Sequence, residues 1–224
     1  MVWRPRMKLL IIAILTSLLS LNFWVGNSSV QQNKISDFEQ SLRTVEGVMQ
    51  VDFVRRTSNQ KILKILDRFN PGLKNDLKQE IANEIYQRSI KYPNLDVDLI
   101  CATITHESGR TWDPKVVSKA GAMGLMQIMP ATGKWLSKYE GISWTGDEEV
   151  LFDPINNIRL GTRYLSALIE TYDLEGGLAA YNGGDKRVRM WLKHDKADGI
   201  LWPETRAYIP FVLNLYDEFK STSL

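Results

Sequence analysis

Apolar residues recur at spacings of three and four through most of this chain, which is the period of one face of an α-helix. One such stripe follows Asp153 and Pro154, a pair that is typical of a helix start, and it consists of Ile158, Gly161, Leu165, Leu168 and Tyr172. No run of alternating polar and apolar residues is convincing enough to predict a strand. We therefore predict an all-α fold.

Boundary signals divide the rest of the chain into further helices. Asp96 is placed to cap the segment "VDLICATITHE", which ends before Gly109, and Asp185 is placed to cap a basic helix. Pro203 begins the last predicted helix. Pro210 lies within that helix, where we expect it to kink or interrupt the helix.

The beginning of the chain has the pattern of a secretory signal. Three cations, Arg4, Arg6 and Lys8, precede an apolar run over residues 9–21. Export to the cell envelope is therefore expected. An uncleaved membrane anchor over residues 9–25 is the alternative to a cleaved signal, because that longer stretch is at the short limit of what spans a bilayer.

Length and composition predict one main domain with a small appendage. With 224 residues, of which 44% are hydrophobic, the chain can bury one substantial core. We expect a signal peptide or membrane anchor over 1–26, a helical N-terminal segment over 27–75 and the main domain over 76–224. The N-terminal segment has one apolar stripe, formed by Ile35, Phe38, Leu42, Val45 and Met49. A coiled coil or a docked partner is one explanation, but packing against the main domain is the commoner one at this length.

Charge and cysteine content argue against several classes of function. The formal charge is +2, but 25 of the 28 basic residues remain against 26 acidic ones once the three cations of the signal are set aside. The exported part is thus nearly neutral, so we expect no nucleic-acid partner. Cys101 is a lone cysteine and is interpreted as a small buried hydrophobe. His106 and His194 lack the companions of a zinc motif, and we expect no metal or organic cofactor.

Glu107 is the strongest candidate for chemistry. It lies in the last turn of a predicted helix whose body is apolar enough to be buried. The negative pole of that helix and the apolar surroundings both disfavour an ionised carboxylate, so its pKa should rise. A carboxylic acid that stays protonated near neutral pH is what a general acid for glycoside cleavage requires.

Four motifs then occur in the order and approximate spacing of a known family. They are "ES" at Glu107, "GLMQIMP" from Gly124, "AYNGG" from Ala180 and "ETRAYI" from Glu204. Over residues 80–220 the chain therefore resembles the soluble lytic transglycosylases, glycoside hydrolase family 23. The resemblance implies an α-helical, lysozyme-like fold with a long glycan groove, and cleavage of peptidoglycan between N-acetylmuramic acid and N-acetylglucosamine to leave 1,6-anhydro ends.

The resemblance also assigns residue roles. Glu107 would be the sole catalytic acid and base, with the substrate's N-acetyl group supporting the departing bond. The implied glycan-binding residues are Ser118, Gln127, Met129, Tyr181, Asn182, Glu204 and Tyr208. Each has an ordinary explanation when taken singly. The "NGG" at Asn182 also fits a plain turn, Met129 also fits core filling, and Tyr208 also fits a half-buried aromatic residue.

One departure from the family pattern affects Ser118. Eleven positions separate it from Glu107, a longer interval than the family usually has, and we expect the extra residues near 110–112 to bulge the loop without moving the helix. Two alternatives to a transglycosylase stay open. One is a goose-type lysozyme, which would deliver water to the same carbon, and the other is a non-catalytic peptidoglycan-binding scaffold protein.

Overall fold

The computed structural model describes residues 38 and 40–222, which belong to two units divided between Val54 and Arg55. Residues 40–54 of the first unit are helical, and the side chains of Leu42, Val45 and Met49 are exposed. The predicted signal or anchor over 1–26 lies outside the described residues. In the part that is described, no helix combines the length and the apolar character needed to cross a membrane.

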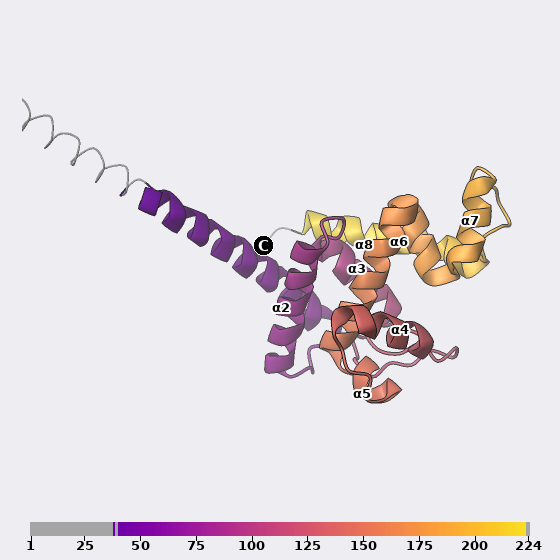
Figure 1. Cartoon of the computed structure of the whole chain (residues 1–224), viewed down its shortest axis with the longest axis horizontal. Coiled ribbons are helices and arrows are strands. Elements are labelled where there is room, and N and C mark those ends of the chain that lie inside the picture. The colour runs from indigo at the N-terminus through magenta and orange to yellow at the C-terminus, as the bar shows by residue number, and fades with distance from the viewer. Residues whose placement is uncertain (1–37, 39, 223–224) are drawn as a thin grey trace, which may run out of the picture. The chain divides into compact units, whose positions relative to one another are not determined.

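The second unit is built from helices joined by turns and loops (Figure 1). After the helical residues 55–69, its elements are α2 (Asn75–Lys91), α3 (Val97–Glu107), α4 (Pro130–Glu140), α5 (Asp147–Leu151), α6 (Pro154–Gly183), α7 (Asp185–Lys193) and α8 (Pro203–Ser221). Between residues 117 and 128 there are isolated β-bridges. The predicted all-α class is confirmed.

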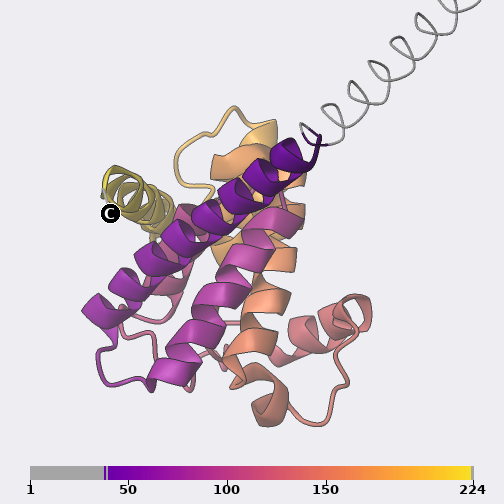
Figure 2. The same ribbon diagram turned by 90° about the vertical axis from the view of Figure 1, so that its left-hand side faces the viewer.

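Helix α6 is central to the second unit, because it packs against α2, α4, α5, α7 and α8. Figure 2 shows α2 lying alongside it. Helix α3 packs between α2 and α8, and its residues 98–105 are buried. Cys101 is fully buried there, as expected for a small hydrophobe, and burial raises the pKa of its thiol. Ile62 and Leu66 belong to the same core, while the domain boundary expected at residues 75 and 76 stays a prediction.

Two of the three predicted caps are confirmed. The side chain of Asp96 accepts a hydrogen bond from the backbone N–H of Leu99, and Asp153 caps α6 in the same way. The cap expected at Asp185 is wrong. A single residue, Gly184, separates α6 from α7, so Asp185 is already the first helical residue and its carboxylate binds Tyr172 instead.

Of the two effects expected at Pro210, the interruption is wrong, because α8 is helical from Pro203 to Ser221, and the kink stays a prediction. Proline removes one backbone donor and leaves the carbonyl four residues earlier without its partner. That carbonyl belongs to Arg206, and both Arg206 and Pro210 lie on the exposed side of α8, where water can satisfy it.

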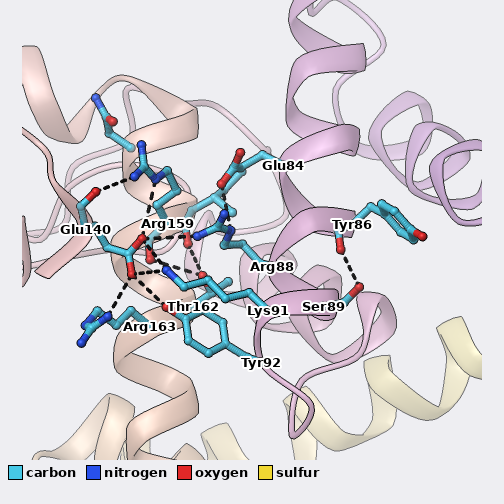
Figure 3. Close-up of polar contacts among 12 residues, drawn as sticks. Glu84, Tyr86, Arg88, Ser89, Lys91, Tyr92, Glu140, Arg159, Thr162 and Arg163 are labelled. Atoms are coloured by element: carbon cyan, nitrogen blue, oxygen red, sulfur yellow. Dashed lines mark hydrogen bonds and ion pairs between the residues drawn. The ribbon is translucent and has the colours of Figure 1, made fainter. Parts of the chain in front are cut away.

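A buried carboxylate ties three helices together (Figure 3). The side chain of Glu140, at the end of α4, is 1% exposed and receives Lys91 Nζ at 2.7 Å from α2 and Arg163 at 3.1 Å from α6. Arg88 and the hydroxyl of Tyr92 also bind it. Burial alone would raise the pKa of Glu140, but its bonds to Lys91, Tyr92 and Arg163 outweigh burial and lower it.

We predict that Glu140→Gln lowers the free energy of unfolding by about 2 kcal/mol at pH 7, because it removes the charge-assisted hydrogen bonds that the buried carboxylate receives from Lys91 and Arg163. The loss should shrink as the pH falls below 4.5, the ordinary pKa of a glutamate carboxyl. A carboxyl with a lowered pKa stabilises the fold only while it is ionised. Urea denaturation at several pH values measures this. Glu148→Gln, at an exposed position in α5, is the control, and an equal effect of both changes would contradict the prediction.

Candidate active site

Glu107 is the last residue of α3, and its Oε1 atom is buried without a hydrogen-bond partner among the described residues. Burial raises the pKa of Glu107 to about 7. The Tyr208 hydroxyl lowers this pKa and the charge of Glu204 raises it further, but both effects are smaller than that of burial. The rise predicted from the sequence is confirmed, and the side chain can hold a proton near neutral pH.

Helix α8 supplies the other side of this carboxyl. Tyr208 is 1% exposed, so it is not the half-buried residue of the ordinary explanation. Its hydroxyl is also buried without a full hydrogen bond, and burial, followed by the charge of Glu107, raises its pKa. The ring of His106 meets that of Tyr208 edge to face, with 4.6 Å between centroids, and burial lowers the pKa of His106. The carboxyl therefore lies in an aromatic, poorly hydrated environment.

The loop before α4 is held in place by one side chain of α6. Asn157 is fully buried, and it donates to the backbone oxygens of Met123 and Leu151 at 2.8 and 2.9 Å. Its own oxygen accepts from the backbone N–H of Met126 at 2.8 Å. Gly124 has a φ of +79°, and a Cβ there would collide with Asn157, so this position requires glycine.

This loop forms one wall of the site and contacts Tyr181. The side chain of Met126 fills space against Gly161 of α6, where a Cβ would not fit. Its backbone oxygen accepts a hydrogen bond of 2.7 Å from the Tyr181 hydroxyl. Gln127 has a φ of 47° and bonds the Gly124 oxygen at 2.8 Å through its side chain. Met126 is therefore a core residue.

A break inside α6 sets the direction of the helical segment that contains Tyr181 and Asn182. Asp173 has a φ of 65° and a ψ of −177°, so the helical path stops there and starts again. Its carboxylate accepts a hydrogen bond of 2.8 Å from the N–H of Gly176, which caps the second half. Burial raises the pKa of Tyr181, and the charge of Glu107 raises it next, so the two side chains lie close together.

A groove with a volume of about 320 Å³ runs beside these residues. It is lined by Gln127, Ile128, Met129, Thr132, Tyr164, Ala180, Tyr181, Asn182, Gly183 and Gly184. Four of the seven predicted glycan-binding residues are therefore brought together, at Gln127, Met129, Tyr181 and Asn182. Glu204 and Tyr208 flank Glu107, which does not line the groove itself but adjoins it through Tyr181.

Ser118 is the predicted site residue that the structure places apart. Its hydroxyl accepts a hydrogen bond from the backbone N–H of Ala122 at 3.0 Å, and its own N–H bonds the oxygen of Ala122 at 2.9 Å. These contacts close a local turn. The glycan-binding role of Ser118 stays a prediction.

The extra residues after Glu107 form a bulge that enters the core. Arg110 and Trp112 have left-handed backbone conformations, with φ of 64° and 48°. Trp112 is fully buried, and its indole N–H donates to the hydroxyl of Thr105 at 2.9 Å. Helix α3 still ends at Glu107. The bulge therefore leaves the acid at the helix end.

Sequence reasoning missed Tyr164, Thr132 and Asn157. Tyr164 packs against Tyr181 with 5.5 Å between ring centroids and lines the groove. A tyrosine within an apolar helix pattern does not reveal that it faces a cavity. In the described residues, no group of three or more His, Cys, Asp or Glu is arranged to hold a metal ion.

Comparison with known proteins identifies the family of this chain. A match to the Transglycosylase SLT domain family covers residues 84–201. The soluble lytic murein transglycosylase of Escherichia coli is 34% identical over 147 residues, or 61% of this chain and 22% of that protein. Membrane-bound lytic murein transglycosylase C of Photorhabdus laumondii is 39% identical over 122 residues, or 50% of this chain and 33% of that protein.

Solved structures agree with the sequence matches. An inactive mutant of lytic transglycosylase Slt from Pseudomonas aeruginosa aligns with a TM-score of 0.55 and 29% identity, over 69% of this chain and 25% of that one. The 70-kDa soluble lytic transglycosylase of Escherichia coli aligns over the same shares, with a TM-score of 0.53 and 32% identity. The chain spans a third or less of the length of these relatives. Because the family match covers more than half of this chain, the chain belongs to the Transglycosylase SLT domain family.

Proposed function

We propose that this protein is a lytic transglycosylase that cleaves peptidoglycan at the β-1,4 bond between N-acetylmuramic acid and N-acetylglucosamine. The observation that carries the proposal is one buried carboxyl, Glu107, whose pKa is raised to about 7 beside a groove lined by tyrosines. A protonated carboxyl at this position is suited to general acid catalysis. Binding alone would not require such an acid.

Glu107 performs both proton transfers in the proposed reaction. It first donates its proton to the bridging oxygen as the bond from that oxygen to the muramyl C1 breaks. The resulting carboxylate then takes the proton of the muramyl 6-hydroxyl, whose oxygen closes onto C1. The products are a free N-acetylglucosamine hydroxyl and a 1,6-anhydro ring, and Glu107 ends protonated as it began. No water is consumed.

The surrounding residues support this chemistry in different ways. Burial of the Glu107 carboxyl favours its protonated form, and the hydrogen-bonding effect of the Tyr208 hydroxyl, which opposes this, is smaller. Gln127, Met129 and Asn182 contact the sugars from the groove walls. Glu204 is the acid whose charge acts on Glu107, and it is exposed.

The printed descriptions of the relatives support the same activity. They are named as lytic murein transglycosylases, and the inactive Pseudomonas aeruginosa enzyme carries one exchange of glutamate for glutamine. That glutamate requirement matches the single acid proposed here. Hydrolysis by water, as in a goose-type lysozyme, and binding without cleavage are the outcomes that experiment must separate from it.

The proposed place of action is the cell envelope, where peptidoglycan lies. The cations and apolar run at the start of the sequence support export, either with cleavage within residues 1–26 or with residues 9–25 kept as an anchor. The segment proposed for 27–75 then connects that start in sequence to the catalytic domain proposed for 76–224. No protein partner is assigned.

We predict that Glu107→Gln abolishes release of muropeptides, because the amide keeps the shape of the carboxyl but cannot transfer its proton. The variant should gain stability relative to the wild type as the pH rises from 5 to 8, by about 3 kcal/mol at most. The folded wild type retains a proton on Glu107 that the unfolded chain releases above pH 4.5. The stability of the wild type therefore falls as the pH rises from 5 to 8. Release assays and denaturation at both pH values test this. A folded variant with near-normal turnover would remove Glu107 from its role.

Another prediction concerns the reducing ends of the products. Muropeptides released from purified peptidoglycan should end in 1,6-anhydro-N-acetylmuramic acid and weigh one water less than lysozyme products. Intramolecular attack is favoured because the 6-hydroxyl is already part of the bound substrate. Mass spectrometry of an unreduced digest measures the difference. Ordinary muramic acid ends as the main primary product would show a hydrolase, and binding without release would show a scaffold protein.

A separate prediction tests export. A reporter that is active only outside the cytoplasm, fused after Leu224, should be active when the full chain is produced in bacteria. Replacing Arg4, Arg6 and Lys8 by glutamate should reduce that activity, because the positive n-region directs insertion. A chain that stays in the cytoplasm with its native start would contradict this proposal.

A further inference from the structure

Two exposed aromatic residues on α4 have no role in the site described above. Trp135 is 53% exposed and Tyr139 is 55% exposed, and their rings meet edge to face with 5.3 Å between centroids. Large aromatic side chains that stay in solvent are informative, because burying them is worth more than for most residues. Neighbouring aromatic residues of this kind often mark a binding surface.

The helix places this pair in line with the groove. Thr132 lines the groove, and residues three and seven positions further along an α-helix lie on nearly the same face. Those positions are Trp135 and Tyr139. Met129, which also lines the groove and is 44% exposed, precedes α4 at the same end. The row Met129, Thr132, Trp135 and Tyr139, here called the α4 stripe, therefore continues the groove wall by about 10 Å beyond Thr132.

The stripe is held in place by the helix beside it. The guanidinium of Arg163 lies 5.0 Å from the centroid of the Tyr139 ring, and the same group binds Glu140 at 3.1 Å. Arg163 adjoins Tyr164, which lines the groove from α6. The aromatic pair is thus preorganised, so a ligand pays little entropy to order it.

We propose that the part of the α4 stripe beyond Thr132 binds saccharide units of the glycan strand that follow those held in the groove, with Trp135 as the main stacking surface. This proposal rests on the proposed function. One face of a pyranose ring carries C–H groups, and the negative face of an aromatic ring attracts them. The continuity of the stripe with the groove selects the glycan as its occupant. The length added is comparable with two linked sugar rings.

The test uses β-1,4-linked N-acetylglucosamine oligomers and the full chain carrying Glu107→Gln, which excludes turnover. In calorimetry, a hexamer should bind about tenfold more tightly than a trimer. Adding Trp135→Ala should remove this gain and leave trimer binding unchanged, while Trp135→Tyr should keep most of it. Lys134→Ala, an exposed change on another face of α4, is the matched control and should preserve the gain.

The outcomes distinguish the two proposals. A gain with length that survives Trp135→Ala would overturn the α4 stripe as a glycan surface and leave it free to serve another partner. Equal binding of trimer and hexamer before any change at Trp135 would overturn it as well. Both results leave the groove and Glu107 untouched. Failure of every oligomer to bind would count against the groove itself and so overturn both proposals.

Discussion

The burial of Glu140 fixes how α4 lies against α2 and α6. A carboxylate that is 1% exposed is costly unless it is paired, and the groups that pair it come from both neighbouring helices. An apolar cluster of similar volume would stabilise the fold as well, but it would tolerate sliding of one helix along another. Directed bonds from Lys91 and Arg163 specify one register. Because Met129 caps α4 and Thr132 lies in its first turn, that register also sets one wall of the groove.

Much of the fold and the central acid could be predicted from the sequence, because both depend on local patterns. The periodic apolar stripes gave the helices, and the caps at Asp96 and Asp153 follow from short polar side chains before such stripes. The raised pKa of Glu107 was predictable for the same reason, since an apolar helix ending in an acid buries that acid. The family motifs then selected Gln127 and Tyr181 from many similar residues.

What the sequence could not provide depends on contacts between distant segments. Asn157 sits within an ordinary amphipathic helix, and only its meeting with the loop at Met126 gives it three hydrogen bonds. The break at Asp173 is hidden in a continuous helical pattern, because its φ of 65° and ψ of −177° form a conformation that normally requires glycine, yet neither glycine nor proline marks the position. At Pro210 the sequence suggested an interruption that is absent. The cost of a proline inside a helix depends on whether the carbonyl it leaves unpaired faces solvent, as it does on this side of α8.

The bulge at Trp112 changes the entropy of the longest loop in the second unit. Residues 108–129 connect α3 to α4, and a free connection of that length would lose much conformational freedom on closing. Burial of the indole fixes the chain near one end, and the bonds from Asn157 fix it near the other. Each remaining span is short. Residues that lengthen the loop therefore also shorten its freely moving parts, and the groove wall is ordered before any sugar arrives.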